Sequence, residues 1–171
     1  ISVMVSINGS LSQRLGVFWA TVIVHAVGTV FALLVCKGKK AGIPGKIFHP
    51  LWIYAGGAVG VMTVVFNNFA YGHISMTSII ALGLLGQTAA SLVIDSFGFF
   101  GMEKCPFRKS VFAGLAFSII GIIIMLDHSV TTGVLAVIFS LFSGITVVLS
   151  RTINARLAQQ IGEMQSSFVN H

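Results

Sequence analysis

Long apolar stretches separated by short polar breaks dominate this sequence. Several stretches hold about 20 residues without period-two alternation, enough for a helix to cross the roughly 30 Å core of a bilayer. Because backbone polar groups cannot stay unpaired in lipid, such stretches must be helical. The expected helices cover residues 16–35, 51–70, 75–99, 111–126 and 133–156, with partial helices over 1–12 and 162–171. The pattern predicts an all-α, polytopic transmembrane helix bundle.

A segment near the start of the chain returns near its end. The segment that begins at Ile7 is repeated from Ile153, and the offset holds out to His25 and His171, with six identities in nineteen aligned positions. An odd number of spans between the copies turns the second copy upside down, as in the inverted repeats of secondary transporters. We therefore expect a first five-helix repeat over residues 1–130 and the start of a second, inverted repeat, truncated in this chain, over 131–171.

Composition and charge fit a membrane protein. The chain is 56% hydrophobic and 8% charged, with a mean hydropathy of +0.98, whereas soluble domains carry about 25% charge. The net charge of +6 does not indicate nucleic-acid binding, because the basic residues lie in short loops beside apolar stretches. Nine of the ten Lys and Arg residues, Arg151 and Arg156 included, fall on one side of the predicted topology. That side is expected to be cytoplasmic, which places the N-terminus inside.

Two histidines related by the repeat are candidate site residues. His25 lies near the middle of its predicted helix, and His171 is its equivalent. The axis of an inverted repeat lies in the membrane plane, so both should lie near mid-membrane. One reading is a neutral histidine that hydrogen-bonds a neighbouring helix. The other is proton coupling, since histidine changes charge near physiological pH.

Two further sets of polar residues are candidates. Asn8 and Asn154 are equivalent in the repeat; they either cap helix ends or close a cavity from opposite sides. Gln87, Ser91 and Asp95 are spaced i, i+4 and i+8 and form one polar stripe on an apolar helix. Asp95 either pairs with nearby basic residues or acts as a cation- or proton-binding carboxylate at the inner end of a substrate path.

Several motifs resemble one known family. The segment Asn8-Gly9-Ser10-Leu11, the segment His25-Ala26-Val27-Gly28-Thr29 and above all the stretch ALGLLGQTAASLVIDSFG at 81–98 are similar to YdcZ-like bacterial inner-membrane proteins of the drug/metabolite transporter superfamily. The resemblance implies ten helices in two inverted halves, with helices 1–4 and 6–9 around a central cavity and helices 5 and 10 outside. It also implies export of small organic molecules across the inner membrane.

The sequence thus favours a secondary transporter that works by alternating access, with a small-molecule substrate and the lipid bilayer as its partners. The spans hold no basic residue at the expected mid-depth, so a lipophilic or weakly polar substrate fits best. No metal cluster, phosphate loop or nucleophile set indicates a cofactor or an enzyme. The alternative is a non-transporting membrane scaffold or regulatory subunit. Either the natural chain is longer, or a second copy or partner chain completes the second repeat.

Overall fold

The computed structural model describes residues 2–38, 50–101, 104, 109–126 and 133–170. These residues are almost entirely helical, and no β-strand occurs among them. The helices are α1 (Ser2–Leu15), α2 (Val17–Gly38), α3 (Gly56–Ala70), α4 (Met76–Phe97), α5 (Lys109–Met125), α7 (Val134–Ile161) and α8 (Glu163–Val169), with short 3₁₀ turns at Leu51–Tyr54 and Phe99–Gly101. The all-α prediction is confirmed.

Four segments are long and apolar enough to cross a membrane: Val17–Gly38, Leu51–Ala70, Met76–Phe97 and Val134–Ile161. They match four of the predicted spans and confirm a polytopic membrane bundle. The main difference is at the end of α7, which continues five residues past the expected end at Arg156 because no helix breaker occurs before Gly162. α5 has a shorter apolar core, Ala113–Ile124.

Local sequence signals fix the ends of α4. The side chain of Ser75 accepts a hydrogen bond from the backbone N–H of Ser78, which satisfies one of the free amides of the first turn. At the other end Gly98 adopts a left-handed conformation, with φ of 66°, and its N–H bonds to the carbonyl of Ile94. This is a common way for a helix to stop, because glycine has no Cβ to strain there.

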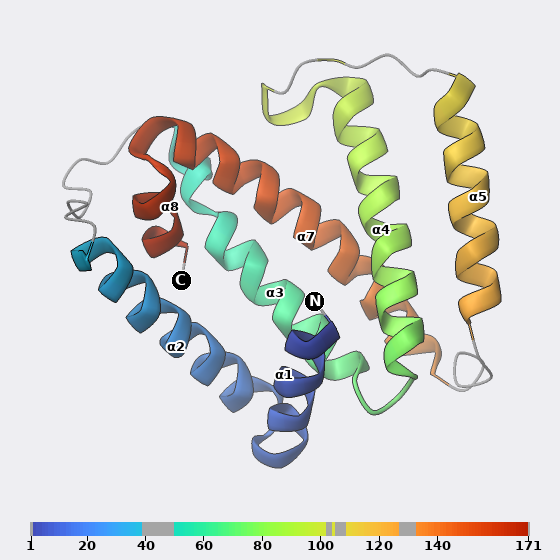
Figure 1. The fold of residues 1–171 in the computed structure, drawn as a ribbon, viewed down its shortest axis with the longest axis horizontal. Helices are drawn as coiled ribbons and strands as arrows, with labels where there is room; N and C mark the ends of the chain where they lie inside the picture. Colours follow the sequence, from blue (N-terminus) through green and yellow to red (C-terminus); the bar gives the residue numbers. More distant parts are fainter. Residues whose placement is uncertain (1, 39–49, 102–103, 105–108, 127–132, 171) are drawn as a thin grey trace.

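α3, α4 and α7 form the packed centre of the molecule (Figure 1). α4 and α7 approach so closely that a Cβ on Gly144 would overlap the carbonyl oxygen of Gly83, and one on Gly86 would overlap that of Leu141. Small residues at a crossing let two membrane helices touch backbone to backbone, which is how helices associate in lipid. The crossing of α4 and α7 is therefore fixed by these glycines.

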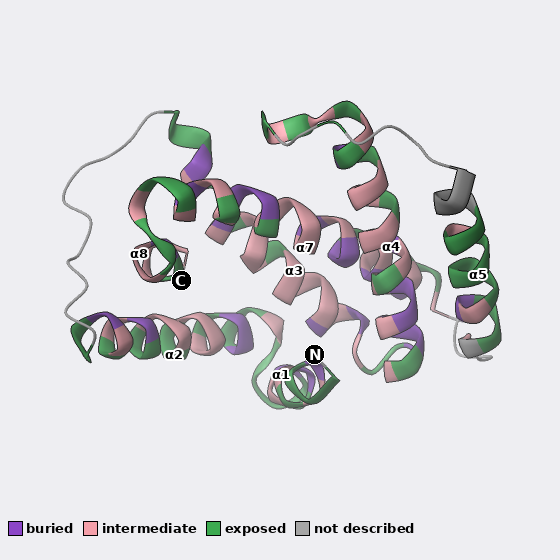
Figure 2. Cartoon of the chain, turned by 45° about the horizontal axis from the view of Figure 1, so that its top comes forward, coloured by how far each residue is buried: buried purple, intermediate pink, exposed green. Residues whose placement is uncertain are grey.

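The outer faces of the bundle are apolar and exposed. Figure 2 shows exposed residues along α2 and α5, at opposite edges of the bundle. Large side chains account for this surface, including Phe18 (79% exposed) and Trp19 (68%) on α2 and Phe117 (76%) on α5. In water such a surface would be unstable, whereas lipid tails solvate it at no cost. α5 packs on α4 at the edge, where the family resemblance places a fifth helix.

The repeated segments lie in opposite directions. α2 and α8 start at equivalent positions, Val17 and Glu163, after the breaks at Gly16 and Gly162. The two helices pack against each other with the end of α2 beside the start of α8. A hydrogen bond from the Cys36 thiol to the carbonyl of Met164 (3.5 Å) joins these two ends. Equivalent helices that run antiparallel are the arrangement expected of an inverted repeat.

Candidate functional site: a cavity between the repeated segments

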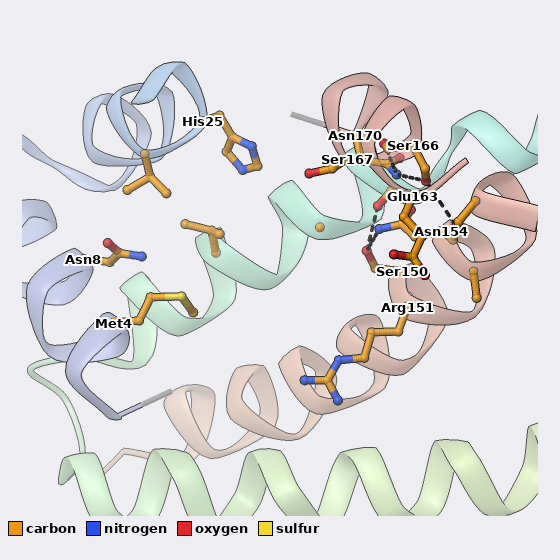
Figure 3. Close-up of a pocket in the computed structure, with 17 residues that line it drawn as sticks. Met4, Asn8, His25, Ser150, Arg151, Asn154, Glu163, Ser166, Ser167 and Asn170 are labelled. Carbon is orange, nitrogen blue, oxygen red and sulfur yellow. Dashed lines mark hydrogen bonds between the residues drawn. The ribbon is translucent and has the colours of Figure 1, made fainter. Parts of the chain in front are cut away.

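A cavity of about 550 Å³ lies between α1, α2, α3, α7 and α8. Its size falls in the range of small-molecule sites. Asn8 and His25 approach it from α1 and α2, opposite the group formed by Asn154 and Asn170 (Figure 3). We call it the main cavity; its polar wall on α7 and α8 consists of Ser150, Arg151, Asn154, Glu163, Ser166 and Asn170.

Equivalent positions of the two copies line the main cavity together. At an offset of 146 residues, the pairs are Met4 with Ser150, Asn8 with Asn154, and Val24 with Asn170. These three matched pairs surround one space, so the cavity lies where the two copies face each other. Only the asparagine pair is identical. In each of the other two pairs the residue of the first copy is apolar and the residue of the second copy is polar. The first copy therefore contributes the apolar Met4 and Val24 together with the polar Asn8 and His25, whereas the second copy contributes a polar side chain at each of the three matched positions.

The polar wall is held by hydrogen bonds to the glycine-rich face of α3. The Ser150 hydroxyl donates to the carbonyl of Gly56 (2.8 Å), and the Asn154 side-chain amide donates to Ser150 Oγ (3.4 Å). From α8, the Ser166 hydroxyl donates to the carbonyl of Asn154 (3.2 Å). Close approach at Gly56 is required, since a Cβ there would overlap Asn154 Oδ1. The glycines of α3 thus bring α7 and α8 into contact with it.

Two acceptor atoms of the polar wall are buried beside Gly56. Asn154 Oδ1 and Asn170 Oδ1 are buried and have no hydrogen-bond partner among the described residues. The amide orientations follow from their neighbours. Asn170 Nδ2 donates to the Ser166 carbonyl (2.8 Å), which can only accept, and the single proton of Ser150 is already directed at Gly56. Both oxygens are therefore left as acceptors.

A smaller cavity of about 260 Å³ lies between α1, α3, α4 and α7. Gln87, Asn67 and Ser143 contribute polar groups to it. Arg151 lines both this side cavity and the main cavity. The charge pattern assigned Arg151 to the cytoplasmic side, but a helical Cβ leans toward the helix N-terminus. The side chain of Arg151 is thereby directed back along α7 and lines both cavities. The cavity walls therefore carry a basic group that the sequence pattern did not predict.

The predicted site residues separate into three groups. Asn8, His25 and Asn154 line the main cavity, and Gln87 lines the side cavity. Ser91 is half-buried and Asp95 is exposed, and neither lines these two cavities. His171 lies outside the described residues. Positions i and i+8 of a helix differ by about 80° around its axis, so Gln87 and Asp95 do not share one direction; a substrate path along Gln87, Ser91 and Asp95 stays a prediction.

Four residues of the polar wall were not predicted to be site residues from the sequence: Arg151, Ser150, Ser166 and Asn170. For Asn170 a signal was available: the repeat aligns it with Val24, so a polar residue replaces an apolar one inside an apolar segment. Across the part of the chain that the structure describes, no group of three or more His, Cys, Asp or Glu side chains could hold a metal ion.

A match to a known family identifies the family of this chain. Residues 1–124 match the family DMT_YdcZ, described as "Putative inner membrane exporter, YdcZ". The chain belongs to this YdcZ family. The resemblance seen in its motifs is thereby confirmed. No curated protein and no solved structure matches the chain. Family membership and the four apolar spans together make this YdcZ-family chain a membrane-embedded protein of an exporter family.

Proposed function

We propose that this YdcZ-family protein is a secondary active transporter that exports small organic molecules by alternating access, with the main cavity as the substrate site. The observation that carries the proposal is the sharing of one cavity by equivalent residues of two oppositely directed segments, above all Asn8 and Asn154. In transporters built from inverted repeats the substrate site lies at the repeat interface near mid-membrane. Rocking one repeat against the other then opens the same site to either side.

Two finer parts of the proposal rest on sequence. The N-terminus is cytoplasmic, which the distribution of Lys and Arg supports. His25 lies at the wall of the main cavity and is the residue through which protons would couple to transport.

Two-sided accessibility tests the proposal without knowledge of the substrate. In a variant with Cys36 and Cys105 replaced by serine, Asn8→Cys is placed in right-side-out and inside-out membrane vesicles and treated with a membrane-impermeant maleimide. Alternating access predicts labelling from both sides. Ala20→Cys, at a position that is 0% exposed on α2, is the matched control and should stay unlabelled.

The scaffold alternative predicts a different result. A non-transporting subunit would leave residue 8 unlabelled or labelled from one fixed side only. Either of these outcomes, with the variant present in the membrane at normal levels, would contradict alternating access at this cavity.

A further inference from the structure

A pocket of about 560 Å³ lies beside the carboxyl ends of α4 and α7, and we call it the head pocket. Trp52 and Phe100 line it with their rings 5.5 Å apart, and Arg156 gives this lining a positive charge. Of the two acids that the structure describes, Asp95 and Glu163, neither lines the head pocket. The head pocket is therefore electropositive and partly aromatic.

The guanidinium of Arg156 is held by the turn that follows α4. Its Nε donates to the carbonyl of Phe100 (2.8 Å), and one Nη donates to Gln159 Oε1 (3.0 Å). A Cβ on Gly101 would lie 2.7 Å from the other Nη, so glycine lets the guanidinium lie against the turn. These bonds use two of the five N–H groups of an arginine. The other three have no partner among the described residues, and a guanidinium fixed in this way suits a phosphate group.

An apolar groove of about 520 Å³ continues from the head pocket, and we call it the chain groove. Beyond their close crossing, α4 and α7 diverge toward their carboxyl ends (Figure 1), and the groove lies between them there. Every described residue that lines it is apolar, Val93 and Ile94 of α4 included. Phe100 lines both spaces, in a backbone conformation that side chains rarely adopt, with φ of 57°. The two spaces thus share one wall.

The groove and the arginine lie along one face of α7. Leu149 and Ile145 line the chain groove at seven and eleven positions before Arg156. Both lie within about 20° of Arg156 around the helix axis, and Ile145 lies about 16 Å further along it. Trp52, near the start of the span Leu51–Ala70, indicates the depth of the membrane interface. The chain groove therefore extends from Arg156, near this interface, toward the middle of the bilayer.

This combination fits the chemistry of an anionic phospholipid, which has a phosphate at the interface and acyl chains beneath it. Basic pockets between membrane helices bind such head groups. A zwitterionic lipid carries a cation beside its phosphate, and a free phosphate ester has nothing to place in the groove. We propose that the head pocket and the chain groove together bind one anionic phospholipid, with its phosphate on Arg156 and an acyl chain between α4 and α7. Neither Arg156 nor Phe100 lines the main cavity, so this lipid site is distinct from the proposed export site.

Fluorescence quenching of the full chain in phosphatidylcholine nanodiscs tests the inference. Trp19→Phe makes Trp52, in the head pocket, the sole tryptophan. A small, equal fraction of the lipid is replaced by phosphatidylglycerol or by phosphatidylcholine, each with brominated acyl chains. We expect phosphatidylglycerol to associate about fivefold more strongly, judged from the quenching of Trp52. Equal quenching by the two brominated lipids would overturn the inference.

Competition separates the whole lipid from its head group. Unbrominated phosphatidylglycerol should restore Trp52 emission, whereas glycerol phosphate, which has the phosphate but no chains, should not. Recovery of emission with glycerol phosphate would contradict a role for the chain groove.

Variants probe the two parts of the site separately. Arg156→Gln removes the positive charge and should abolish the preference for phosphatidylglycerol. Lys37→Gln is the matched control, because Lys37 is an exposed cation in the last turn of α2 and does not line either space. It should keep the preference. Ala89→Phe fills the chain groove from an exposed position on α4 and leaves Arg156 in place. It should weaken quenching by brominated phosphatidylglycerol severalfold.

The ratio of quenching by the two lipids within one variant is the quantity compared, since a displaced Trp52 changes both values. Loss of the preference in Arg156→Gln and Lys37→Gln alike would show only a general attraction of anionic lipid to a basic chain, and would overturn the inference. Unchanged quenching in Ala89→Phe would contradict it independently of how Arg156→Gln folds. Lipid binding is measured without flux, so failure of the two-sided labelling test would overturn transport and leave this inference intact.

Discussion

Gly16 and Gly162 make the same break in two segments that lie 146 residues apart. Both have a positive φ, 84° and 92°. The N–H of Gly16 bonds to the carbonyl of Ser12 and that of Gly162 to the carbonyl of Ala158, each at 2.8 Å. Their own carbonyls accept from the residue four positions later, Ala20 or Ser166, each at 3.0 Å. The sequence repeat is thus also a repeat of backbone geometry.

These junctions give the first prediction. Gly16→Ala and Gly162→Ala each force a Cβ into a backbone conformation that side chains rarely adopt, at a cost of about 1–3 kcal/mol. Both variants should lower the melting temperature in detergent by similar amounts. Gly114→Ala, in α5 with no atom near its Cβ position, should leave it unchanged or raise it. Equal melting temperatures for the three variants would show that the junctions impose no constraint.

The crossing of α4 and α7 gives the second prediction. In Gly144→Ala the added methyl meets the Gly83 carbonyl oxygen and lies 2.8 Å from the Gln87 backbone nitrogen. Backbone atoms cannot rotate away, so the helices must separate, which should cost about 1–3 kcal/mol. Thermal unfolding in detergent measures the loss. Gly121→Ala has open space around it and is the control; a Gly144→Ala chain as stable as this control would contradict the close crossing.

The end of α4 gives the third prediction. Arg156 Nε donates to the carbonyl of Phe100 (2.8 Å), and Arg156 also donates to Gln159 Oε1 (3.0 Å). Phe100 has a φ of 57° and its ring lies 5.5 Å from that of Trp52. Arg156→Lys keeps the charge but loses the planar pair of donors. It should release this turn, so that Trp52 emission shifts to the red and acrylamide quenches it more strongly.

The readout of that experiment needs a background with one tryptophan. Trp19→Phe leaves Trp52 as the sole tryptophan, since the chain contains two. Arg151→Lys is a matched control for loss of a guanidinium elsewhere on α7. A Trp52 spectrum that changes equally in both variants would show that Arg156 does not hold the turn.

The outer face of α2 gives the fourth prediction. Trp19 is 68% exposed within a segment apolar enough to span a bilayer, whereas the neighbouring Ala20 is 0% exposed. In a Trp52→Phe background, lipids brominated on their acyl chains should quench Trp19 strongly. In the double variant Trp19→Phe/Ala20→Trp the indole ring moves to the buried side of α2. We expect its emission to be quenched less by the brominated lipids, or the variant chain to fold less well. Absence of quenching at Trp19 would contradict the lipid-facing assignment of α2.

Element positions could be predicted from the sequence because lipid imposes one simple rule, long apolar stretches, on every span. The repeat predicted that Asn8 and Asn154 belong together, and both line the main cavity. The side-chain directions could not be obtained this way. Arg151 lies within the helix predicted over 133–156 and its charge assigned it to the cytoplasmic side, yet its side chain lines the main cavity and the side cavity. Asp95 is on the predicted helix but exposed, because its rotation relative to Gln87 depends on how α4 crosses its neighbours.

The opposite directions of the two copies are the central claim, and a disulfide tests them most directly. The thiol of Cys36, at the end of α2, lies 3.5 Å from the carbonyl of Met164, near the start of α8. With Cys105 replaced by serine, Met164→Cys should form an intrachain disulfide with Cys36 under mild oxidation, and Val169→Cys, at the far end of α8, should not. Efficient cross-linking of Val169→Cys together with none of Met164→Cys would mean that α2 and α8 run parallel, and would contradict the inverted arrangement.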